Sequence, residues 1–417
     1  MRFRYRATFT LSVWLFAFAL LPCFAQNAPA AAHWVGTWAS SQQIPEPANA
    51  LPPEELRDAT LRQIVHLSVG GSELRVHLSN AFGTAPLHVD SVHIARPLSP
   101  SSDQIDVTTD KALTFGGSSD VVIPAGAEYI SDPVDYPVAA LSNLAISFHL
   151  AEPPAQQTGH PGSRATSYVV HGNLVSVAKL PNAAKVDHWY QIAGVDVTTS
   201  ANPVSIVALG DSITDGHVST TNGNDRWTDD LAERLQGSPA TTQIGVLNQG
   251  IGGNHLLVDG LGPNALARFN RDVIAQTGVC YVIVLEGVND LGGLTRLGEV
   301  SPAQHDALVA HIVAAYQQMI LRAHAHGIEI IGATITPYTG SDYYHPTARD
   351  ELDRNAVNAW IRAAGHFEAV VDFDKVMRDP SHPDRLLPGY DSGDHLHPSP
   401  AGYRAMANAI PLSLFHP

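Results

Sequence analysis

Two motifs, far apart in the sequence, contain the side chains that nucleophilic catalysis needs. Ser212 lies in the motif G-D-S-I-T-D-G, directly after an apolar run over residues 205–209. Asp394 stands three residues before His397, in a loop bounded by glycine and proline. That spacing lets the Asp394 carboxylate reach one ring nitrogen of His397, which fixes the tautomer and stabilises the imidazolium. The other nitrogen is then free to take a proton from a serine.

Each of these motifs also has a simpler interpretation when it is read alone. Ser212 or Asp211 could cap the helix that follows, and His395 and His397 could be two ligands of a metal ion. No further cluster of Cys, His or carboxylate side chains with ligand spacing accompanies the two histidines. The sequence therefore favours a site without a metal ion, and it indicates no cofactor.

Two more motifs offer hydrogen-bond donors for a negative charge that develops during a reaction. Residues 248–254 read N-Q-G-I-G-G-N, and their glycines let backbone N–H groups approach a ligand closely. Residues 286–290 read E-G-V-N-D, where the Asn289 side-chain amide could turn into the same crevice. A tight glycine turn and an ordinary Asn turn are the alternative interpretations.

These motifs follow short apolar runs that predict the strands of one sheet. The runs cover residues 205–209, 243–248, 279–285, 328–334 and 369–373, and helical patterns over 225–236 and 302–326 lie between them. A capping box at Ser301 and Gln304 begins the longer helix, and Gly327 ends it. Buried strands that alternate with helices predict a parallel sheet covered on both faces. In such sheets ligands bind at the carboxyl ends of the strands, where the motifs with Ser212, Gly253 and Asn289 lie.

Together and in this order, the four motifs resemble those of the SGNH, or GDSL, hydrolase family over residues 204–410. The resemblance implies an α/β domain of the flavodoxin-like, three-layer α/β/α type and a carboxylic ester hydrolase. It makes Ser212 the nucleophile, with His397 and Asp394 completing a catalytic triad. It also implies an oxyanion hole formed by the backbone N–H groups of Ser212 and Gly253 and by the Asn289 side chain. Gly252 stays open as an alternative to Gly253.

The residues before position 200 have a β pattern instead. Alternating runs over 62–69 and 74–78 flank Gly70 and Gly71, which predicts a hairpin with a glycine turn. Further short runs follow at 87–94, 120–123 and 144–150, without a convincing long amphipathic helix. We expect an antiparallel β-sandwich of jelly-roll type over 33–198, followed by the α/β hydrolase domain over 203–417.

Two segments of this first half carry a second resemblance. Residues 34–39 read W-V-G-T-W-A and residues 78–83 read L-S-N-A-F-G. They look like segments of a secreted two-domain subgroup of GDSL esterases, described as arylesterases or acylhydrolases. In that subgroup a β-sandwich precedes the hydrolase domain.

The N-terminus and the charge balance bear on where the protein acts and what it binds. Residues 1–25 combine three arginines, an apolar stretch and small residues before a cut after Ala25, which predicts a cleaved signal peptide and a secreted or periplasmic protein. The 417 residues carry 24 basic and 40 acidic side chains, and cleavage changes the net charge from −16 to −19. No basic field for nucleic acid is present. Cleavage also removes Cys23, leaving Cys280 alone without a disulfide partner, and it leaves no transmembrane segment in the mature chain.

The sequence thus predicts a secreted serine esterase that removes small acyl groups, such as acetyl, from carbohydrate. Tyr338, Tyr343 and Tyr344, in the loop after the fourth strand of the α/β half, are candidate substrate-binding residues. The alternatives are a lipase or lysophospholipase and, from a different class, a catalytically inactive glycan-binding protein. The expected partner is a small-molecule or polysaccharide ester, with the oligomeric state left open.

Overall fold

In the computed structural model, which describes residues 33–199 and 203–416, two antiparallel sheets make up most of the chain before residue 200. We call residues 33–199 the β region. Its first sheet joins β1 (His33–Ala39), β15 (Ile192–Thr199), β3 (Gly71–Ser79) and β8 (Glu128–Ile130), with β9 (Val134–Val138) also paired to β3. Its second sheet joins β13 (Ala184–Val186), β12 (Ser167–His171), β2 (Ala59–His66), β10 (Asn143–Leu150), β5 (Ser91–Pro97) and β6 (Ile105–Ala112).

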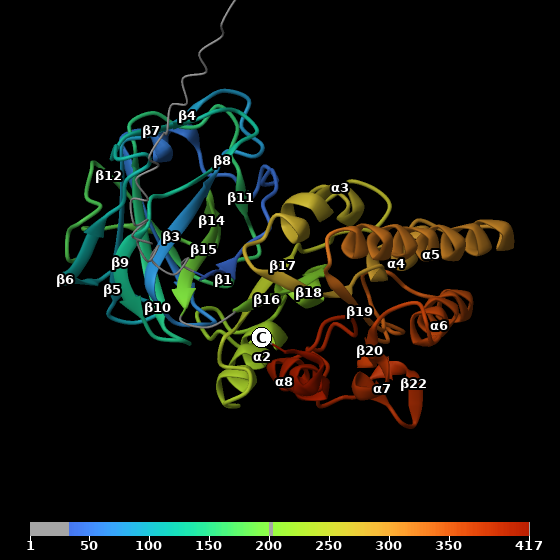
Figure 1. Cartoon of the computed structure of the whole chain (residues 1–417). Coiled ribbons are helices and arrows are strands. Elements are labelled where there is room, and N and C mark those ends of the chain that lie inside the picture. Colours follow the sequence, from blue (N-terminus) through green and yellow to red (C-terminus); the bar gives the residue numbers. More distant parts are fainter. Residues whose placement is uncertain (1–32, 200–202, 417) are drawn as a thin grey trace, which may run out of the picture. The chain divides into compact units, whose positions relative to one another are not determined.

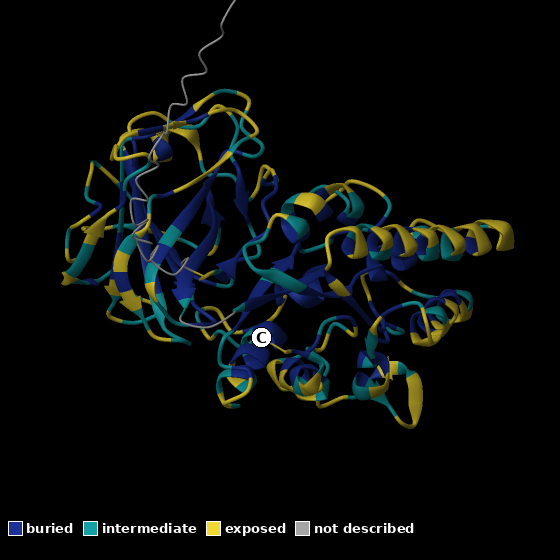
Figure 2. Cartoon of the chain, in the orientation of Figure 1, coloured by how far each residue is buried: buried dark blue, intermediate teal, exposed yellow. Residues whose placement is uncertain are grey.

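Shorter elements complete the β region. They are the pair β4 (Leu87–Val89) and β7 (Val121–Ile123), the pair β11 (Gly159–His160) and β14 (Trp189–Tyr190), and the 3-10 helix η1 (Pro53–Leu56). Both large sheets turn apolar side chains such as Leu61, Leu74 and Phe148 into one core, and none of the three is exposed. Figure 2 shows buried strands, in dark blue, in the middle of the β region. The predicted antiparallel β-rich domain is confirmed, whereas its jelly-roll connectivity stays a prediction. The predicted signal peptide over 1–25, with Cys23, lies outside the described residues.

The hairpin predicted around Gly70 and Gly71 is wrong. The strands on either side, β2 and β3, belong to different sheets and do not pair with each other. A Cβ on Gly70 would lie 2.7 Å from the Ala140 backbone nitrogen, and one on Gly71 would lie 2.5 Å from the Thr198 carbonyl oxygen. The two glycines therefore serve close backbone approach where the chain crosses from one sheet to the other, and not a tight turn.

Residues 203–416, which we call the α/β region, contain the predicted parallel sheet. Its order is β17 (Ile244–Gly250), β16 (Val204–Gly210), β18 (Val279–Leu285), β19 (Glu329–Ala333) and β20 (Ala369–Val371), with every neighbouring pair parallel. In chain order this is 2-1-3-4-5, the strand order of flavodoxin-like sheets. The strands are nearly continuous apolar runs because both faces are buried.

Helices cover both faces of this sheet. They are α1 (Ser212–Asp215), α2 (Trp227–Gln236), α3 (Ala265–Phe269), α4 (Val288–Thr295), α5 (Pro302–Ala325), α6 (Ala348–Arg362), α7 (Phe373–Met377) and α8 (Pro400–Ala409). A π-helical turn η2 (Asn270–Ile274), a 3-10 turn η3 (Leu412–Leu414) and the ribbon of β21 (Arg378–Asp379) and β22 (His382–Leu386) complete the region. Figure 1 shows α3, α4 and α5 above the sheet and α2 and α8 below it. The capping box predicted at Ser301 and Gln304 is present at the start of α5.

The β region packs against β17, the edge strand of the parallel sheet. The Ser68 hydroxyl accepts a hydrogen bond from the Val246 N–H at 2.9 Å, and a Cβ on Gly36 would lie 2.8 Å from the Leu247 side chain. This contact covers an edge that would otherwise be open to another strand. Residues 33–417 form one compact unit, so the partition into domains at 33–198 and 203–417 stays a prediction.

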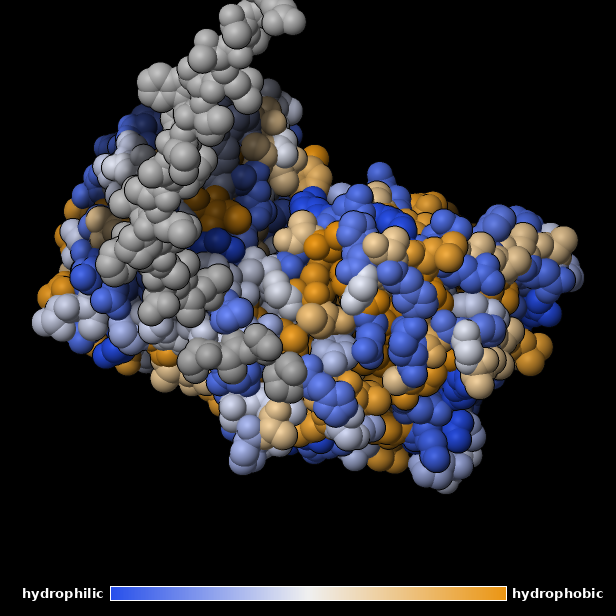
Figure 3. All heavy atoms as spheres, viewed as in Figure 1, coloured by the Kyte–Doolittle hydropathy of each residue, from blue (hydrophilic) through white to orange (hydrophobic). Residues whose placement is uncertain are grey.

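Hydrophilic and hydrophobic residues are mixed over the visible face of the α/β region in Figure 3. Among residues 33–199 and 203–416, no helix combines the length and the apolar character that crossing a membrane requires.

Candidate active site

Ser212 lies at the turn where β16 ends and α1 begins. It is the first residue of α1 and is 6% exposed. Asp211 is the N-cap, and its Oδ1 accepts a hydrogen bond from the Ile213 N–H at 2.9 Å. The N–H groups of the first helical turn have no partner within their own helix, so the Ser212 N–H stays available to a ligand.

A continuous row of hydrogen bonds joins Ser212 to the predicted histidine and carboxylate. Ser212 Oγ lies 2.8 Å from His397 Nε2, and His397 Nδ1 lies 2.6 Å from Asp394 Oδ2. The neighbouring His395 is half exposed, and its Nδ1 lies 2.6 Å from Asp391 Oδ2 instead. The structure therefore brings together the three residues predicted for the triad and leaves His395 out of it.

The Asp394 carboxylate is held in one orientation by its neighbours. Its Oδ1 accepts hydrogen bonds from the backbone N–H groups of Leu396 (3.0 Å) and His397 (2.8 Å) and from the Ser392 hydroxyl (3.0 Å). Burial raises the pKa of Asp394, but the hydrogen bonds from the His397 ring and backbone outweigh it and hold the pKa below its ordinary value. An ionised Asp394 keeps the His397 Nδ1 protonated and turns Nε2 toward Ser212 as an acceptor.

The structure separates Gly252 and Gly253, the two candidates for a backbone donor. The Gly252 N–H donates to Asp215 Oδ2 at 3.1 Å and is thus occupied. Among the described residues, the Gly253 N–H donates no hydrogen bond, and Gly253 lines the same pocket as Ser212. Gly253 has a φ of 72°, which favours glycine, and a Cβ there would meet Leu261 at 2.6 Å. Gly253 is therefore the better placed donor.

The Asn289 amide is oriented by two partners. Its Nδ2 donates to the Asn254 carbonyl at 2.6 Å, and its Oδ1 accepts from the Tyr344 hydroxyl. An amide nitrogen carries two hydrogens, so one remains for a ligand in the pocket that Asn289 lines. Tyr344 thus fixes which end of the amide faces that ligand.

These groups open into a pocket of about 750 Å³ with walls from both regions. Its lining includes Gln43, Glu46, Asn49, Pro161, Gly162 and Arg164 from the β region, and Ser212, Gly253, Asn289, Tyr343, Tyr344, Asp394 and His397 from the α/β region. The expectation that Tyr338 contacts substrate is corrected: Tyr338 is 1% exposed and does not line the pocket. It packs edge-on behind Tyr344, with 6.2 Å between the ring centroids.

Sequence reasoning missed two residues beside the triad, Arg164 and His217. The His217 ring lies 4.2 Å from the His397 ring, centroid to centroid, and its Nδ1 accepts a hydrogen bond from Arg164 Nη2 at 2.6 Å. Burial, followed by the charges of His397 and Arg164, lowers the pKa of His217 to about 4, so the ring is neutral at neutral pH. The place of His217, five residues after the nucleophile, was visible in the sequence. Nothing in the sequence pattern indicated that Arg164 would come close.

Two clusters of described residues have the side chains of metal ligands. They are His217, Asp394 and His397 in the pocket, and His305, Asp350 and Asp353 at the packed faces of α5 and α6. In the first cluster Arg164 donates to His217 Nδ1, and in the second His305 is hydrogen-bonded to Asp353. The positive charge of Arg164 therefore disfavours a cation beside the triad.

Beneath the nucleophile turn lie carboxyl groups without full hydrogen-bonding partners. Burial raises the pKa of Asp211 from 3.8 to about 7, against the hydrogen bond from Ile213. Burial also raises the pKa of Glu286 well above 4.5, and neither of its carboxylate oxygens has a hydrogen-bond partner. Burial therefore favours the protonated form of both groups, against the positive charge of Arg268, whose Nη2 lies 3.7 Å from Glu286 Oε2.

Replacing Asp211 by asparagine should stabilise the fold at pH 8 and change little at pH 4. Between pH 3.8 and about 7 the unfolded chain loses the Asp211 proton while the folded chain keeps it, so the free energy of unfolding falls as pH rises. Above both values the cost reaches on the order of 4 kcal/mol. Asparagine keeps the acceptor for the Ile213 N–H and carries no charge. Thermal unfolding of both proteins at the two pH values measures the difference, and equal effects at both would contradict this electrostatic origin.

The comparisons with known proteins agree with the geometry. Residues 208–405 match the model of the GDSL-like lipase/acylhydrolase family. These residues belong to that family. The GDSL-like domain spans β16 to α8 and therefore contains Ser212, Gly253, Asn289, Asp394 and His397. The chain is thus a carboxylic ester hydrolase, which confirms the family and the enzyme class predicted from the four motifs.

Solved structures similar to this chain carry related names. A lipase/acylhydrolase from Enterococcus faecalis is 22% identical with a TM-score of 0.38, and the match covers 49% of this chain and 92% of that one. A GDSL-like lipase from Bacteroides thetaiotaomicron is 22% identical with a TM-score of 0.36, covering 50% and 89%. An acetyl xylan esterase from Geobacillus stearothermophilus is 21% identical with a TM-score of 0.35, covering 50% and 94%. No curated protein matches the chain significantly.

Proposed function

We propose that the protein is an exported serine esterase that removes small acyl groups, such as acetyl, from carbohydrate through an acyl-enzyme. The observation that carries the proposal is the unbroken row from Asp394 through His397 to Ser212 at the floor of the pocket. Export is proposed from the signal pattern over residues 1–25.

The reaction begins when Ser212 Oγ attacks the ester carbonyl carbon and its proton passes to His397 Nε2. The carbonyl oxygen becomes an oxyanion, which the Ser212 and Gly253 N–H groups and the Asn289 amide stabilise. The carbon–oxygen bond to the alcohol then breaks, and the alcohol leaves with the proton from His397. Water, deprotonated by His397, repeats the sequence on the acyl-enzyme and releases the acid and free Ser212.

The walls of the pocket support a hydroxyl-rich alcohol in the substrate. Gln43 and Asn49 donate their amides to the Glu46 carboxylate at 3.0 and 2.7 Å, which fixes a planar polar group at the rim. Arg164 lies beside His217 and so close to His397, the residue that protonates the leaving alcohol. Planar amides and guanidinium groups offer the directed hydrogen bonds that sugar hydroxyls accept and donate.

A panel of esters tests the substrate. Purified protein is assayed on acetylated xylan, acetylated monosaccharides, aryl acyl esters of rising chain length, and lysophospholipids. The proposal expects the highest kcat/KM on acetylated sugars and a fall as the acyl chain lengthens. A preference for long acyl chains or lysophospholipids would replace it with the lipase alternative. Binding to glycan without turnover of any ester would favour the inactive glycan-binding alternative.

Replacing Asn289 by alanine should lower kcat by on the order of 10²–10³, because one of three oxyanion donors is lost. KM should change little, since the charge on the carbonyl oxygen is largest in the transition state. Steady-state kinetics on an aryl acetate separate the two constants. An unchanged kcat would remove Asn289 from the oxyanion hole.

A further inference from the structure

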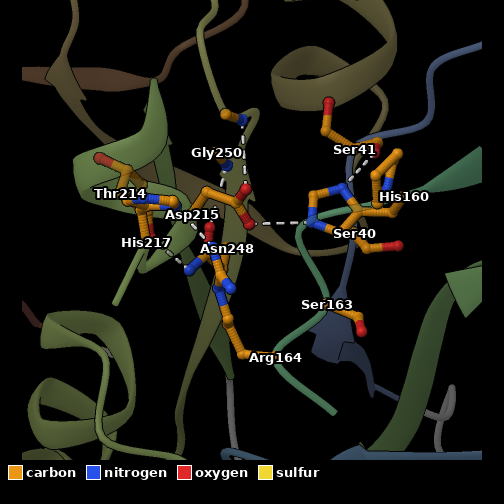
Figure 4. Close-up of polar contacts among 12 residues, drawn as sticks. Ser40, Ser41, His160, Ser163, Arg164, Thr214, Asp215, His217, Asn248 and Gly250 are labelled. Carbon is orange, nitrogen blue, oxygen red and sulfur yellow. Dashed lines mark hydrogen bonds and ion pairs between the residues drawn. The ribbon is translucent and has the colours of Figure 1, made fainter. Parts of the chain in front are cut away.

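A buried histidine of the β region is hydrogen-bonded to the nucleophile turn of the α/β region. His160, in β11, is 3% exposed, and its Nε2 lies 2.9 Å from Asp215 Oδ1 (Figure 4). Asp215 ends α1, the short helix that begins with Ser212. The Trp189 ring stacks on His160, with 5.8 Å between the centroids. This contact therefore lies one helical turn from the reacting serine.

Both ring nitrogens of His160 face groups that accept hydrogen bonds. Nδ1 lies 2.8 Å from the carbonyl oxygen of Ser41, which can only accept, so Nδ1 carries a proton. Nε2 lies 2.9 Å from Asp215 Oδ1, and one of these two atoms carries the proton of the hydrogen bond between them. His160 thus joins the Ser41 backbone to Asp215 and holds the carboxylate in one orientation.

The orientation of the Asp215 carboxylate matters because its second oxygen binds the loop that contains Gly252 and Gly253. Asp215 Oδ2 accepts the Gly252 N–H at 3.1 Å, one residue before the proposed oxyanion donor Gly253. Close packing leaves this carboxylate little freedom: a Cβ on Gly162 would lie 1.8 Å from Asp215 Oδ2, and one on Gly250 would lie 2.2 Å from the Asp215 nitrogen. The direction of the Gly253 N–H therefore depends on where His160 holds Asp215.

Ser41, whose carbonyl oxygen accepts the hydrogen bond from His160, makes a second contact with the α/β region through its side chain. The Ser41 hydroxyl donates to Asp272, which is paired with Arg268 at 3.0 Å. Arg268 is 2% exposed and donates to the carbonyl oxygens of Gly210 (2.9 Å) and Gln249 (2.6 Å), at the ends of β16 and β17. The β region thus contacts both Asp215, which binds the Gly252 N–H, and the groups that hold the ends of β16 and β17.

We propose that His160 is a positioning residue for the oxyanion hole, acting through Asp215 and Gly252 on the Gly253 N–H. The β region is then an integral part of the catalytic apparatus. The proposal rests on the ester hydrolysis proposed above, because the oxyanion exists only in that reaction.

Two substitutions of His160 divide its hydrogen bonds between them. Glutamine can place an amide N–H where Nε2 stands and keep the bond to Asp215, whereas asparagine reaches only the Nδ1 position and keeps the bond to Ser41. We expect His160→Asn to lower kcat by about 10- to 100-fold at unchanged KM, because a small displacement of a transition-state donor is costly. His160→Gln should recover most of that loss.

His149→Gln is the matched control. His149 is also a buried histidine of the β region, 4% exposed, and lies 2.7 Å from Asp90 and 3.1 Å from Asp58. Both of these partners belong to the β region. We expect His149→Gln to lower the thermal midpoint as His160→Asn does while leaving kcat unchanged.

Amide hydrogen exchange over residues 250–254 gives a readout that needs no substrate. The proposal expects faster exchange there in His160→Asn than in His160→Gln, wild type or the control. Equal exchange in all four proteins would overturn it even if no ester were hydrolysed. If exchange is faster in His160→Asn as expected but the wild-type protein hydrolyses no ester, the proposed function would be overturned instead. A fall of kcat in both His160 variants that matches their loss of stability would assign His160 a purely structural role.

Discussion

Replacing Ser212 by alanine should lower kcat by on the order of 10⁶, the loss seen when the nucleophile of a serine hydrolase is removed. The hydroxyl is 2.8 Å from His397 Nε2, and His397 Nδ1 is 2.6 Å from Asp394, so alanine at position 212 leaves this base without a hydroxyl to deprotonate. The oxyanion donors would remain and would leave a residual rate of about 10³–10⁴ over water. Steady-state kinetics on an aryl acetate measure the loss.

A fluorophosphonate probe, which reacts with an activated serine, gives the same result without a natural substrate. Wild type should be labelled at Ser212, and Ser212→Ala should not be labelled. Ser219→Ala is the control, since Ser219 is also buried but does not line the pocket. Equal labelling of Ser212→Ala and wild type would move the nucleophile to another residue.

The parallel sheet and the residues at the ends of its strands could be predicted from the sequence, whereas the order of the strands came from the structure. Apolar runs such as 205–209 must be buried on both faces, and the reacting motifs stand directly after them, so the topology itself gathers Ser212 and Asn289 at one edge. The loop motif with Asp394 and His397 is equally local, because three residues separate the two partners. Patterns of this kind are set by residues close together in the sequence, so they can be predicted without knowing how distant segments pack.

What the sequence could not supply were contacts between distant segments. Alternation of polar and apolar residues predicted the strands around Gly70 and Gly71 but gave no information on which strand each would pair with. No periodic sequence pattern identifies Gln43 or Arg164 as pocket-lining residues, because their position in the pocket depends on how the two regions pack. The choice between Gly252 and Gly253 likewise needed Asp215, which decides it by accepting one N–H and leaving the other.

The β region had the least readable role in the sequence, and the structure gives it a specific one. It supplies part of the pocket wall, and through His160 and Ser41 it contacts groups that fix the ends of β16 and β17. A pocket shared in this way makes the substrate alcohol a property of both regions, whereas the triad belongs to the GDSL-like domain alone. We therefore expect substitutions at Gln43 and Asn49, which line the pocket without contacting the triad, to change specificity more than the chemical step, in contrast to substitutions at His160.

Replacing His397 by alanine should cost as much as replacing Ser212, on the order of 10⁶ in kcat, because serine is a weak nucleophile without a base. The double variant Ser212→Ala/His397→Ala should be no slower than either single variant, since the two residues act as one unit. A further loss in the double variant would mean that His397 works independently of Ser212.

His395→Ala is the matched control for this position. His395 belongs to the same loop and has its own carboxylate partner, Asp391, at 2.6 Å, but it is half exposed and does not line the pocket. Because a histidine needs a serine within reach as well as a carboxylate behind it, we expect His395→Ala to keep kcat near the wild-type value. Both histidines have a carboxylate partner, but only His397 lies next to Ser212. A loss of kcat in His397→Ala alone would therefore show that a His–Asp pair supports the reaction only where it faces the serine.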